Sequence, residues 1–193
     1  MIPIKKITGR LGNQMFQFAT LFAKAKNEGT DYYFQNPAYF EDCKDEIKIM
    51  YGYGIVPVDR VGIHIRRGDY VNNPFYADLM TAGYYERAMA LFPDEKFLVF
   101  SDDIEWCKQQ DIFKDCEFSE GKTEIEDMNL MAGCKHQIIA NSSFSLWCGI
   151  LNPNPNKKVI CPPETKYYSD GMIRTKYPNY FIQLDFDYEP VIK

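Results

Sequence analysis

Short apolar runs alternate with helical patterns along most of this chain, and this alternation limits the fold more than any other feature. The apolar runs predict strands at residues 2–7, 60–65, 96–100, 136–140 and 157–161. Helical patterns follow at residues 13–28 and 81–92, after Thr123, and within residues 141–151. We therefore expect an α/β fold with a Rossmann-like parallel sheet and flanking helices. A ligand of such a sheet binds at the carboxyl ends of the strands.

Composition and charge argue against a nucleic-acid-binding protein and against a zinc protein. The 193 residues carry a net charge of −5, so we expect no nucleic-acid partner. The six cysteines are scattered, with no C-x-x-C pair and only two histidines beside them. This pattern favours free thiols in a reducing cytosol over a zinc site. Without a signal peptide or an apolar run long enough to span a membrane, we expect a cytoplasmic protein, either free or peripheral at the inner face of the membrane.

The strand predicted at residues 60–65 leads into "HIRRGDYV", which is rich in charged side chains. Alternation places His64 and Arg66 on one face of the strand and Arg67 on the other. A buried arginine needs an anion, and a phosphate suits its planar fork. We predict that Arg66 binds a phosphate and that Arg67 pairs with Asp69 or another carboxylate to hold the loop. Internal salt bridges for both arginines are the alternative.

Three further segments bring polar groups to turns between strands and helices. "GRLGNQ", residues 9–14, is a glycine turn before a helix, which suits phosphate or serves only as a connection. In "FSDD", Asp102 can accept hydrogen bonds from ribose or guanine, whereas Asp103 can cap the next helix. "NSSFS", residues 141–145, offers three hydroxyl groups at a helix start, for phosphate binding or for capping.

Together these segments predict a diphosphate held by arginine and helix N-termini without a metal. A cationic side chain at that place would neutralise the charge that builds up on a diphosphate leaving group. This is the chemistry of a nucleotide-sugar glycosyltransferase. A kinase is the weaker reading, because the glycine turn has no P-loop lysine.

The segments "GRLGNQMFQFA", "HIRRGDYV", "FSDD" and "CKHQIIANSSFSLW" closely resemble motifs of the bacterial α-1,2-fucosyltransferases, glycosyltransferase family 11. The resemblance implies a GT-B-like arrangement of two Rossmann-like domains. It also implies transfer of L-fucose, with inversion, from GDP-fucose to a hydroxyl of a galactoside-containing glycan acceptor in α-1,2 linkage. No metal and no cofactor would be needed.

The same resemblance implies roles for single residues. Arg66 would bind the β-phosphate, His64 the nucleoside and Asp102 the guanine. The other implied contacts are Gly12, Asn13 and Gln14 on the N-terminal side, and Ser142, Ser143 and Phe144 on the phosphate side. Arg66 and Asp69 are the candidates for a catalytic role, and we expect Asp69 to shape the loop rather than to abstract a proton.

This sequence departs from the family in its N-terminal part. Members are usually longer, and here residues 30–35 follow the first helix almost directly. We expect a reduced N-terminal, acceptor-side region at residues 1–60 and a GDP-sugar-binding Rossmann-like domain at residues 61–193. Three hypotheses follow: a compact fucosyltransferase, a non-catalytic GDP- or GDP-sugar-binding remnant, and a homo-oligomer in which a second copy supplies the missing wall.

Overall fold

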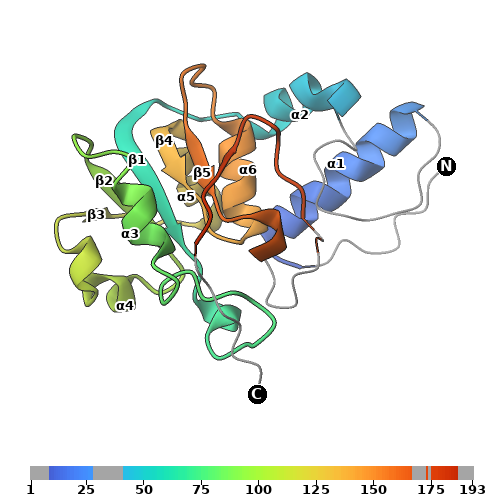
Figure 1. Cartoon of the computed structure of the whole chain (residues 1–193). Coiled ribbons are helices and arrows are strands. Elements are labelled where there is room, and N and C mark those ends of the chain that lie inside the picture. The colour runs from blue at the N-terminus through green and yellow to red at the C-terminus, as the bar shows by residue number, and fades with distance from the viewer. Residues whose placement is uncertain (1–8, 28–40, 167–172, 174, 187–193) are drawn as a thin grey trace.

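The computed structural model of the chain describes residues 9–27, 41–166, 173 and 175–186. These residues form a six-stranded sheet in which every pair of neighbouring strands is parallel. The strands are β1 (Val58–Ile65), β2 (Phe97–Ser101), β3 (Glu117–Phe118), β4 (Cys134–Ile138), β5 (Val159–Cys161) and β6 (Ile182–Gln183). Their order is β3-β2-β1-β4-β5-β6, the order of a doubly wound Rossmann sheet. The predicted α/β fold is therefore confirmed (Figure 1).

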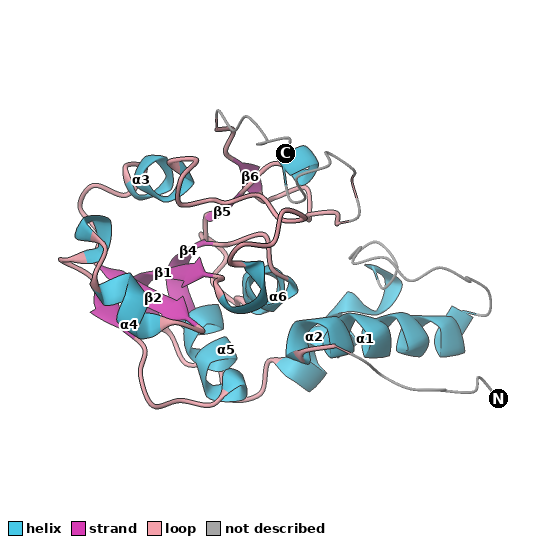
Figure 2. Cartoon of the chain, turned by 90° about the horizontal axis from the view of Figure 1, so that it is seen from below, coloured by secondary structure: helices cyan, strands magenta, loops and turns pink. Residues whose placement is uncertain are grey.

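Helices cover both faces of this sheet. They are α1 (Leu11–Asn27), α2 (Lys44–Tyr51), α3 (Tyr84–Met89), α4 (Ile104–Lys108), α5 (Glu124–Gly133) and α6 (Ser143–Leu151). Helices α3 and α4 lie on one face and α5 and α6 on the other, while α1 and α2 pack against α6 (Figures 1 and 2). Within the described ranges, no helix is both long and apolar enough to cross a membrane.

Alternation along the central strands separates two hydrophobic layers. Ile63 and Ile65 of β1 lie in the layer that includes α3. Phe100 of β2 and Trp147 of α6 lie in the opposite layer, which α1, α2 and α5 complete. All four side chains are buried. Removing this apolar surface from water is the main stabilising contribution to such a sheet, and it holds β1 and β2 in one orientation.

Most of the predicted elements are present. The strands expected at residues 60–65, 96–100, 136–140 and 157–161 correspond to β1, β2, β4 and β5. The strand expected at residues 2–7 lies outside the described residues. The sequence pattern does not predict β3 and β6, because a two-residue strand is too short to show alternation.

The helix expected at residues 81–92 is shorter, covering Tyr84–Met89. The carboxylate of Asp78 accepts two backbone N–H groups from the residues that follow it, which holds this segment in a turn. Gly83 then adopts a left-handed conformation, with φ 65°, at the N-cap. Glycine tolerates this conformation, so the helix begins only after the turn.

Two predicted helix starts are confirmed. Thr123 and Glu126 form the capping box of α5. Asp103 caps α4 by accepting the backbone N–H of Trp106 at 3.2 Å. Both caps satisfy N–H groups that the first helical turn leaves free. They therefore hold in place the loops that follow β2 and β3.

Helix α1 docks on the start of α6 through a close backbone approach. A Cβ atom at Gly12 would lie only 2.6 Å from the carbonyl carbon of Ser143, so a larger residue would push the helices apart. The buried Trp147 donates its indole N–H to the carbonyl of Gly12 at 3.1 Å. These contacts bring the glycine turn to the carboxyl end of the sheet. The division of the chain into an N-terminal region at residues 1–60 and a nucleotide-binding domain at residues 61–193 stays a prediction.

Candidate functional site

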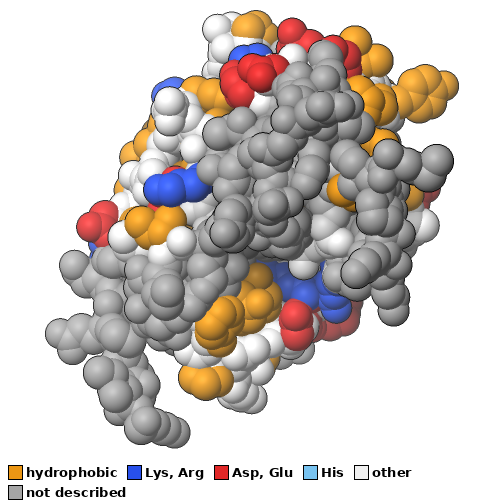
Figure 3. All heavy atoms as spheres, turned by 90° about the vertical axis from the view of Figure 1, so that its right-hand side faces the viewer, with side chains coloured by type: hydrophobic (Ala, Val, Ile, Leu, Met, Phe, Trp, Pro, Cys, Tyr) orange, Lys and Arg blue, Asp and Glu red, His pale blue; other side chains and the backbone are white. Residues whose placement is uncertain are grey.

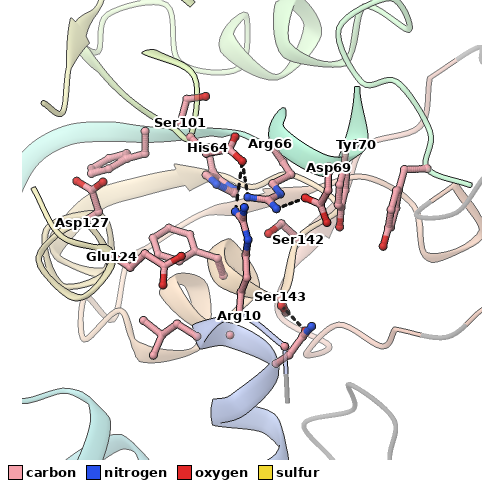
Figure 4. A pocket seen from close by; sticks show the side chains of 18 of the residues that line it. Arg10, His64, Arg66, Asp69, Tyr70, Ser101, Glu124, Asp127, Ser142 and Ser143 are labelled. Atoms are coloured by element: carbon pink, nitrogen blue, oxygen red, sulfur yellow. Dashed lines mark hydrogen bonds and ion pairs between the residues drawn. The ribbon is translucent and has the colours of Figure 1, made fainter. Parts of the chain in front are cut away.

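A pocket of about 410 Å³ lies at the carboxyl ends of β1 and β2. Its walls come from the segments after these strands, the starts of α1 and α6, and the loop that leads into α5 (Figure 4). The strand order reverses between β1 and β4, which is where open α/β sheets bind their ligands. All four polar segments found in the sequence contribute residues to this pocket.

Arg66 lies at the centre of the pocket, held by two carboxylates. Its side chain is only 9% exposed. Its Nη1 lies 2.5 Å from Oδ2 of Asp102, and its Nη2 forms an ion pair with Asp69. Tyr70 places its ring 5.3 Å from the guanidinium carbon. Both arginines thus form internal salt bridges, which was the alternative reading of the sequence. Asp69 pairs with Arg66 rather than with Arg67, and phosphate binding by Arg66 stays a prediction.

Arg67 points to the other side, toward the scaffold. Its guanidinium lies over the ring of Trp106, with 3.5 Å from the guanidinium carbon to the ring centroid. Its Nε lies 3.4 Å from Oδ2 of Asp103. The predicted carboxylate partner of Arg67 is thus Asp103, the residue that also caps α4. Arg67 ties the loop after β1 to the loop after β2.

Asp102 connects three segments of the pocket. Its Oδ2 accepts from Arg66 and also lies 3.4 Å from Nη1 of Arg10. Its Oδ1 accepts the backbone N–H of Arg67 at 2.9 Å. The next residue of the loop, Gly68, has no room for a Cβ because Asp102 occupies that space. Asp102 therefore orients Arg66, and the predicted guanine contact of Asp102 stays a prediction.

His64 forms part of the pocket floor and is neutral. The residue is 5% exposed, and burial lowers the pKa of its imidazole to about 3. Its Nδ1 lies 3.0 Å from the hydroxyl of Ser145, and its ring centroid lies 5.1 Å from that of Phe144. A neutral imidazole at this depth can offer one donor and one acceptor. The predicted contact with the nucleoside is not tested by this arrangement.

The N-terminal segment reaches the pocket with two of its three predicted residues. Gly12 and Asn13 line the pocket, and Oδ1 of Asn13 accepts the hydroxyl of Ser143 at 2.8 Å. Gln14 is exposed and is not part of the lining. Its side-chain amide donates to the carbonyl of Gly9 at 2.7 Å and supports the turn before α1.

The start of α6 supplies the predicted serine-rich wall. Ser142, Ser143 and Phe144 all line the pocket. Ser142 occupies the N-cap without a side-chain cap hydrogen bond. Ser145, in contrast, is fully buried; it contacts His64 and accepts the backbone N–H of Ala140. The hydroxyl of Ser145 therefore supports the site from below, whereas the first two serines face the pocket.

Several lining residues are not among the contacts that the sequence predicts. They are Arg10, Tyr70, Tyr76, Lys122, Glu124 and Asp127. Tyr70 lies within the segment "HIRRGDYV", so its position offered a signal. Lys122, Glu124 and Asp127 lie before and within α5, in the segment that follows β3. Because β3 is too short to recognise from the sequence, only the order of the strands in the sheet shows that these residues reach the pocket. Asp127 accepts the hydroxyl of Ser119 at 2.6 Å, and burial raises the pKa of its carboxyl group.

Charge in the pocket is close to balanced. Three cationic residues and four carboxylates line it, namely Arg10, Arg66 and Lys122, and Asp69, Asp102, Glu124 and Asp127. An incoming anion must therefore take arginine contacts that carboxylates now hold. In the part of the chain that the structure describes, no group of three or more His, Cys, Asp and Glu residues is arranged to hold a metal ion.

Fold and site define a class: a Rossmann-type α/β protein with an arginine-centred pocket at its switch point. The chain belongs to glycosyl transferase family 11, which matches residues 32–180. The matched range includes Arg66, Asp102 and the serine-rich start of α6. The resemblance seen in the sequence is thereby confirmed at the level of the family.

Three relatives illustrate the similarity. An α-1,2-colitosyltransferase of Escherichia coli is 38% identical over 139 residues, which are 60% of this chain and 48% of the relative. The O-antigen biosynthesis glycosyltransferase WbnK of Escherichia coli is 36% identical, over 52% of this chain and 37% of the relative. A galactoside 2-α-L-fucosyltransferase of Mus musculus is 28% identical, over 59% and 38% respectively. The chain thus matches less than half the length of each of these curated relatives.

Proposed function

We propose that this chain binds GDP-fucose and transfers L-fucose, with inversion, to a galactoside hydroxyl in α-1,2 linkage. The observation that carries the proposal is Arg66, a nearly buried arginine at the switch point of the sheet, opposite the serine-rich start of α6. Membership in glycosyl transferase family 11 supports the reaction class. The fucosyltransferase among the relatives supports the sugar and the linkage.

Donor binding begins with an exchange of ion pairs. Arg66 now contacts Asp69 and Asp102, and the donor diphosphate would replace at least one of them. Asp69 is the easier to displace, because its side chain is 62% exposed whereas that of Asp102 is 23% exposed. The exchange conserves charge-assisted hydrogen bonds, so Arg66 stays paired throughout.

The carboxylates that do not bind Arg66 support a position for the nucleoside. Glu124 and Asp127 lie at one end of the pocket and Asp69 and Tyr70 at the other, with Arg66 between them (Figure 4). Guanine presents two adjacent N–H donors and needs a carboxylate acceptor. Only one oxygen of Asp127 accepts a hydrogen bond, from the hydroxyl of Ser119, among the described contacts. Both oxygens of Asp102 already accept hydrogen bonds, one from Arg66 and one from the backbone N–H of Arg67. We therefore place guanine at the Asp127 end and fucose at the Asp69 end.

In the transfer step, the oxygen of the acceptor hydroxyl forms a bond to C1 of fucose as the bond from C1 to the β-phosphate oxygen breaks. The hydroxyl proton passes to a basic group of the site or to water. The electron pair of the broken bond stays on the phosphate, so GDP leaves with additional negative charge. Arg66 stabilises this charge, and the N–H groups at the start of α6 add to the effect. These groups are fixed before the reaction, so little reorganisation is needed.

The nucleotide assignment is tested by calorimetric titration with GDP, with UDP and ADP as controls. We expect binding that is selective for GDP. Asp127→Asn and Asp102→Asn separate the two candidates for guanine recognition. If Asp127 reads guanine, Asp127→Asn removes the preference for GDP over ADP, while Asp102→Asn weakens all nucleotides alike. Binding of no nucleotide would overturn the proposal.

The transfer step is tested with β-galactoside acceptors and two donors. GDP-fucose is the expected donor. GDP-colitose is the second, because one of the relatives is a colitosyltransferase at 38% identity. Product from either donor eliminates the non-catalytic remnant as an interpretation. Selective GDP binding without any product would instead favour that remnant, or an assembly in which a second copy completes the acceptor side.

A further inference from the structure

A second hollow lies at the opposite end of the sheet. This groove, of about 630 Å³, is bounded by α2, the end of α6 and the loop at residues 152–157 that leads into β5. The loop precedes β5 and so lies at the amino ends of the strands, whereas the first pocket lies at their carboxyl ends (Figure 1). We call it the α2 groove. None of the residues proposed to bind the nucleotide contributes to it.

The walls of the α2 groove are partly apolar and partly polar, and two lysines face into it. Ile49, Ile55 and Leu151 contribute the apolar part, and Lys48 and Lys157 are the cationic residues of the lining. Both lysines are half-buried. The molecule seen from the side of α1 and α2 shows hydrophobic side chains along the upper edge of this face, beside charged ones (Figure 3). The groove therefore combines two cations with an apolar surface.

Lys157 is held in place by its own loop. Its Nζ donates to the carbonyl of Asn152 at 2.6 Å and lies 5.2 Å from the ring centroid of Tyr180. Asn152 is itself 2% exposed and donates to the carbonyl of Cys134 at 2.7 Å, so the loop is anchored to β4. An ammonium group has three donors, and a carbonyl uses one of them. The position of the ammonium is thus fixed while part of its hydrogen-bonding capacity stays free.

In the described part of the chain, the charges of the two lysines are not neutralised by an ion pair. Among the residues that the structure describes, neither forms an ion pair with a carboxylate. Burial, and to a lesser degree repulsion from Lys48, lowers the pKa of Lys157 to about 8. Two ammonium groups that face one groove repel each other, and a bound anion would offset this repulsion. Such an anion would also accept hydrogen bonds from the ammonium groups of the two lysines.

We propose that the α2 groove is a phosphate-binding site in which Lys48 and Lys157 hold a phosphoryl group and the apolar wall and Tyr180 contact the part of the ligand attached to it. A phosphoryl group offers several acceptor oxygens, which match two point-charge donors on separate elements. The same chemistry is found in a soluble phosphate ester and in the headgroup of an anionic lipid. The site is independent of the proposed nucleotide function.

The test observes the lysines directly. Titration of the protein with inorganic phosphate, followed by NMR of the lysine ε-methylene groups, separates this site from the arginine pocket. The signal of Lys157 is identified by its loss in Lys157→Gln. We expect saturable shifts for Lys48 and Lys157, and in Lys48→Gln an affinity at Lys157 that is weaker by about tenfold, which corresponds to one lost charge-assisted hydrogen bond.

The matched control is Lys158→Gln, which removes the same charge from the exposed neighbour of Lys157 outside the groove. It should leave the phosphate response unchanged, and so should Arg66→Ala. Thermal melting confirms that each variant is folded. Equal, non-saturating shifts for all lysines, or an unchanged response of Lys157 in Lys48→Gln, would overturn the proposal.

Vesicle sedimentation then distinguishes the two sources of phosphate. Phosphatidylcholine vesicles, with and without phosphatidic acid, are mixed with the wild-type protein and with each glutamine variant. Binding that requires both phosphatidic acid and the two groove lysines identifies a lipid headgroup. A saturable phosphate response without vesicle binding identifies a soluble ester. Vesicle binding that persists unchanged in Lys48→Gln and Lys157→Gln contradicts the site.

Discussion

Arg66 and Asp102 form an ion pair at 2.5 Å between residues that lie 36 positions apart in the sequence. The pair joins the ends of β1 and β2, two neighbouring strands of the sheet. Asp102 also accepts the backbone N–H that follows Arg66. The central cation of the pocket is thus oriented before any ligand arrives, as preorganised electrostatic stabilisation requires.

Arg66→Ala should abolish measurable GDP binding with little loss of fold. In the proposed complex, Arg66 donates two charge-assisted hydrogen bonds to the diphosphate of GDP. Losing both weakens binding by about a hundredfold or more. Calorimetric titration measures this loss. Arg60→Ala is the matched control, because Arg60 lies on the same strand and pairs with Glu117, away from the pocket lining. GDP affinity that is equal in both variants would refute the role of Arg66.

Arg67→Ala should reduce stability rather than nucleotide affinity. The substitution removes the stacking on Trp106 and the contact with Asp103, which together contribute about 1–2 kcal/mol. The backbone N–H that reaches Asp102 remains in the variant. Arg67→Lys keeps the charge but not the planar stacking group, so it should recover only part of the loss. Urea denaturation measures the effect, and a wild-type unfolding midpoint for Arg67→Ala contradicts the scaffold role.

Gly12→Ala should separate the starts of α1 and α6. The added Cβ would meet backbone atoms of Ser143 and Phe144 at 2.6 and 2.7 Å, and backbone cannot rotate away as a side chain can. Overpacking of this kind reduces stability by about 1–3 kcal/mol. Gln14→Ala, on the exposed side of the same helix, is the comparison: it removes only the hydrogen bond to the carbonyl of Gly9 and should reduce stability less than Gly12→Ala does. Thermal melting and GDP titration should both be impaired in Gly12→Ala, and two unaffected measurements would contradict the close approach.

Stability should fall as the pH is lowered from about 6.5, partly because of His64. Burial lowers the pKa of His64 from 6.5 to about 3 in the folded protein. Between these values the unfolded chain takes up a proton that the folded protein does not, so acid favours unfolding, by up to about 1.4 kcal/mol per pH unit. The free energy of unfolding of wild type and His64→Gln, measured at several pH values, isolates this contribution. Identical pH profiles of the two proteins would show that His64 is not buried as described.

Local sequence pattern determined much of the fold. Hydrophobic periodicity places four of the strands correctly, and capping chemistry identifies the starts of α4 and α5 at Asp103 and Thr123. Alternation along β1 also separates the directions of Arg66 and Arg67. Each of these features depends on residues within a few positions of one another, so the chain order alone contains the necessary information.

Tertiary structure alone decided which groups meet. Asp102 and Asp69 hold Arg66, Asp103 holds Arg67, and Asp127 reaches the same pocket from α5, while Gln14 stays outside the lining. The backbone of Gly12 meets that of Ser143 only because α1 and α6 pack together. Such pairings depend on the order of strands in the sheet and on helix docking, which set distances between residues far apart in the chain. Sequence shows that charges of both signs are present, but only the assembled sheet determines how they pair.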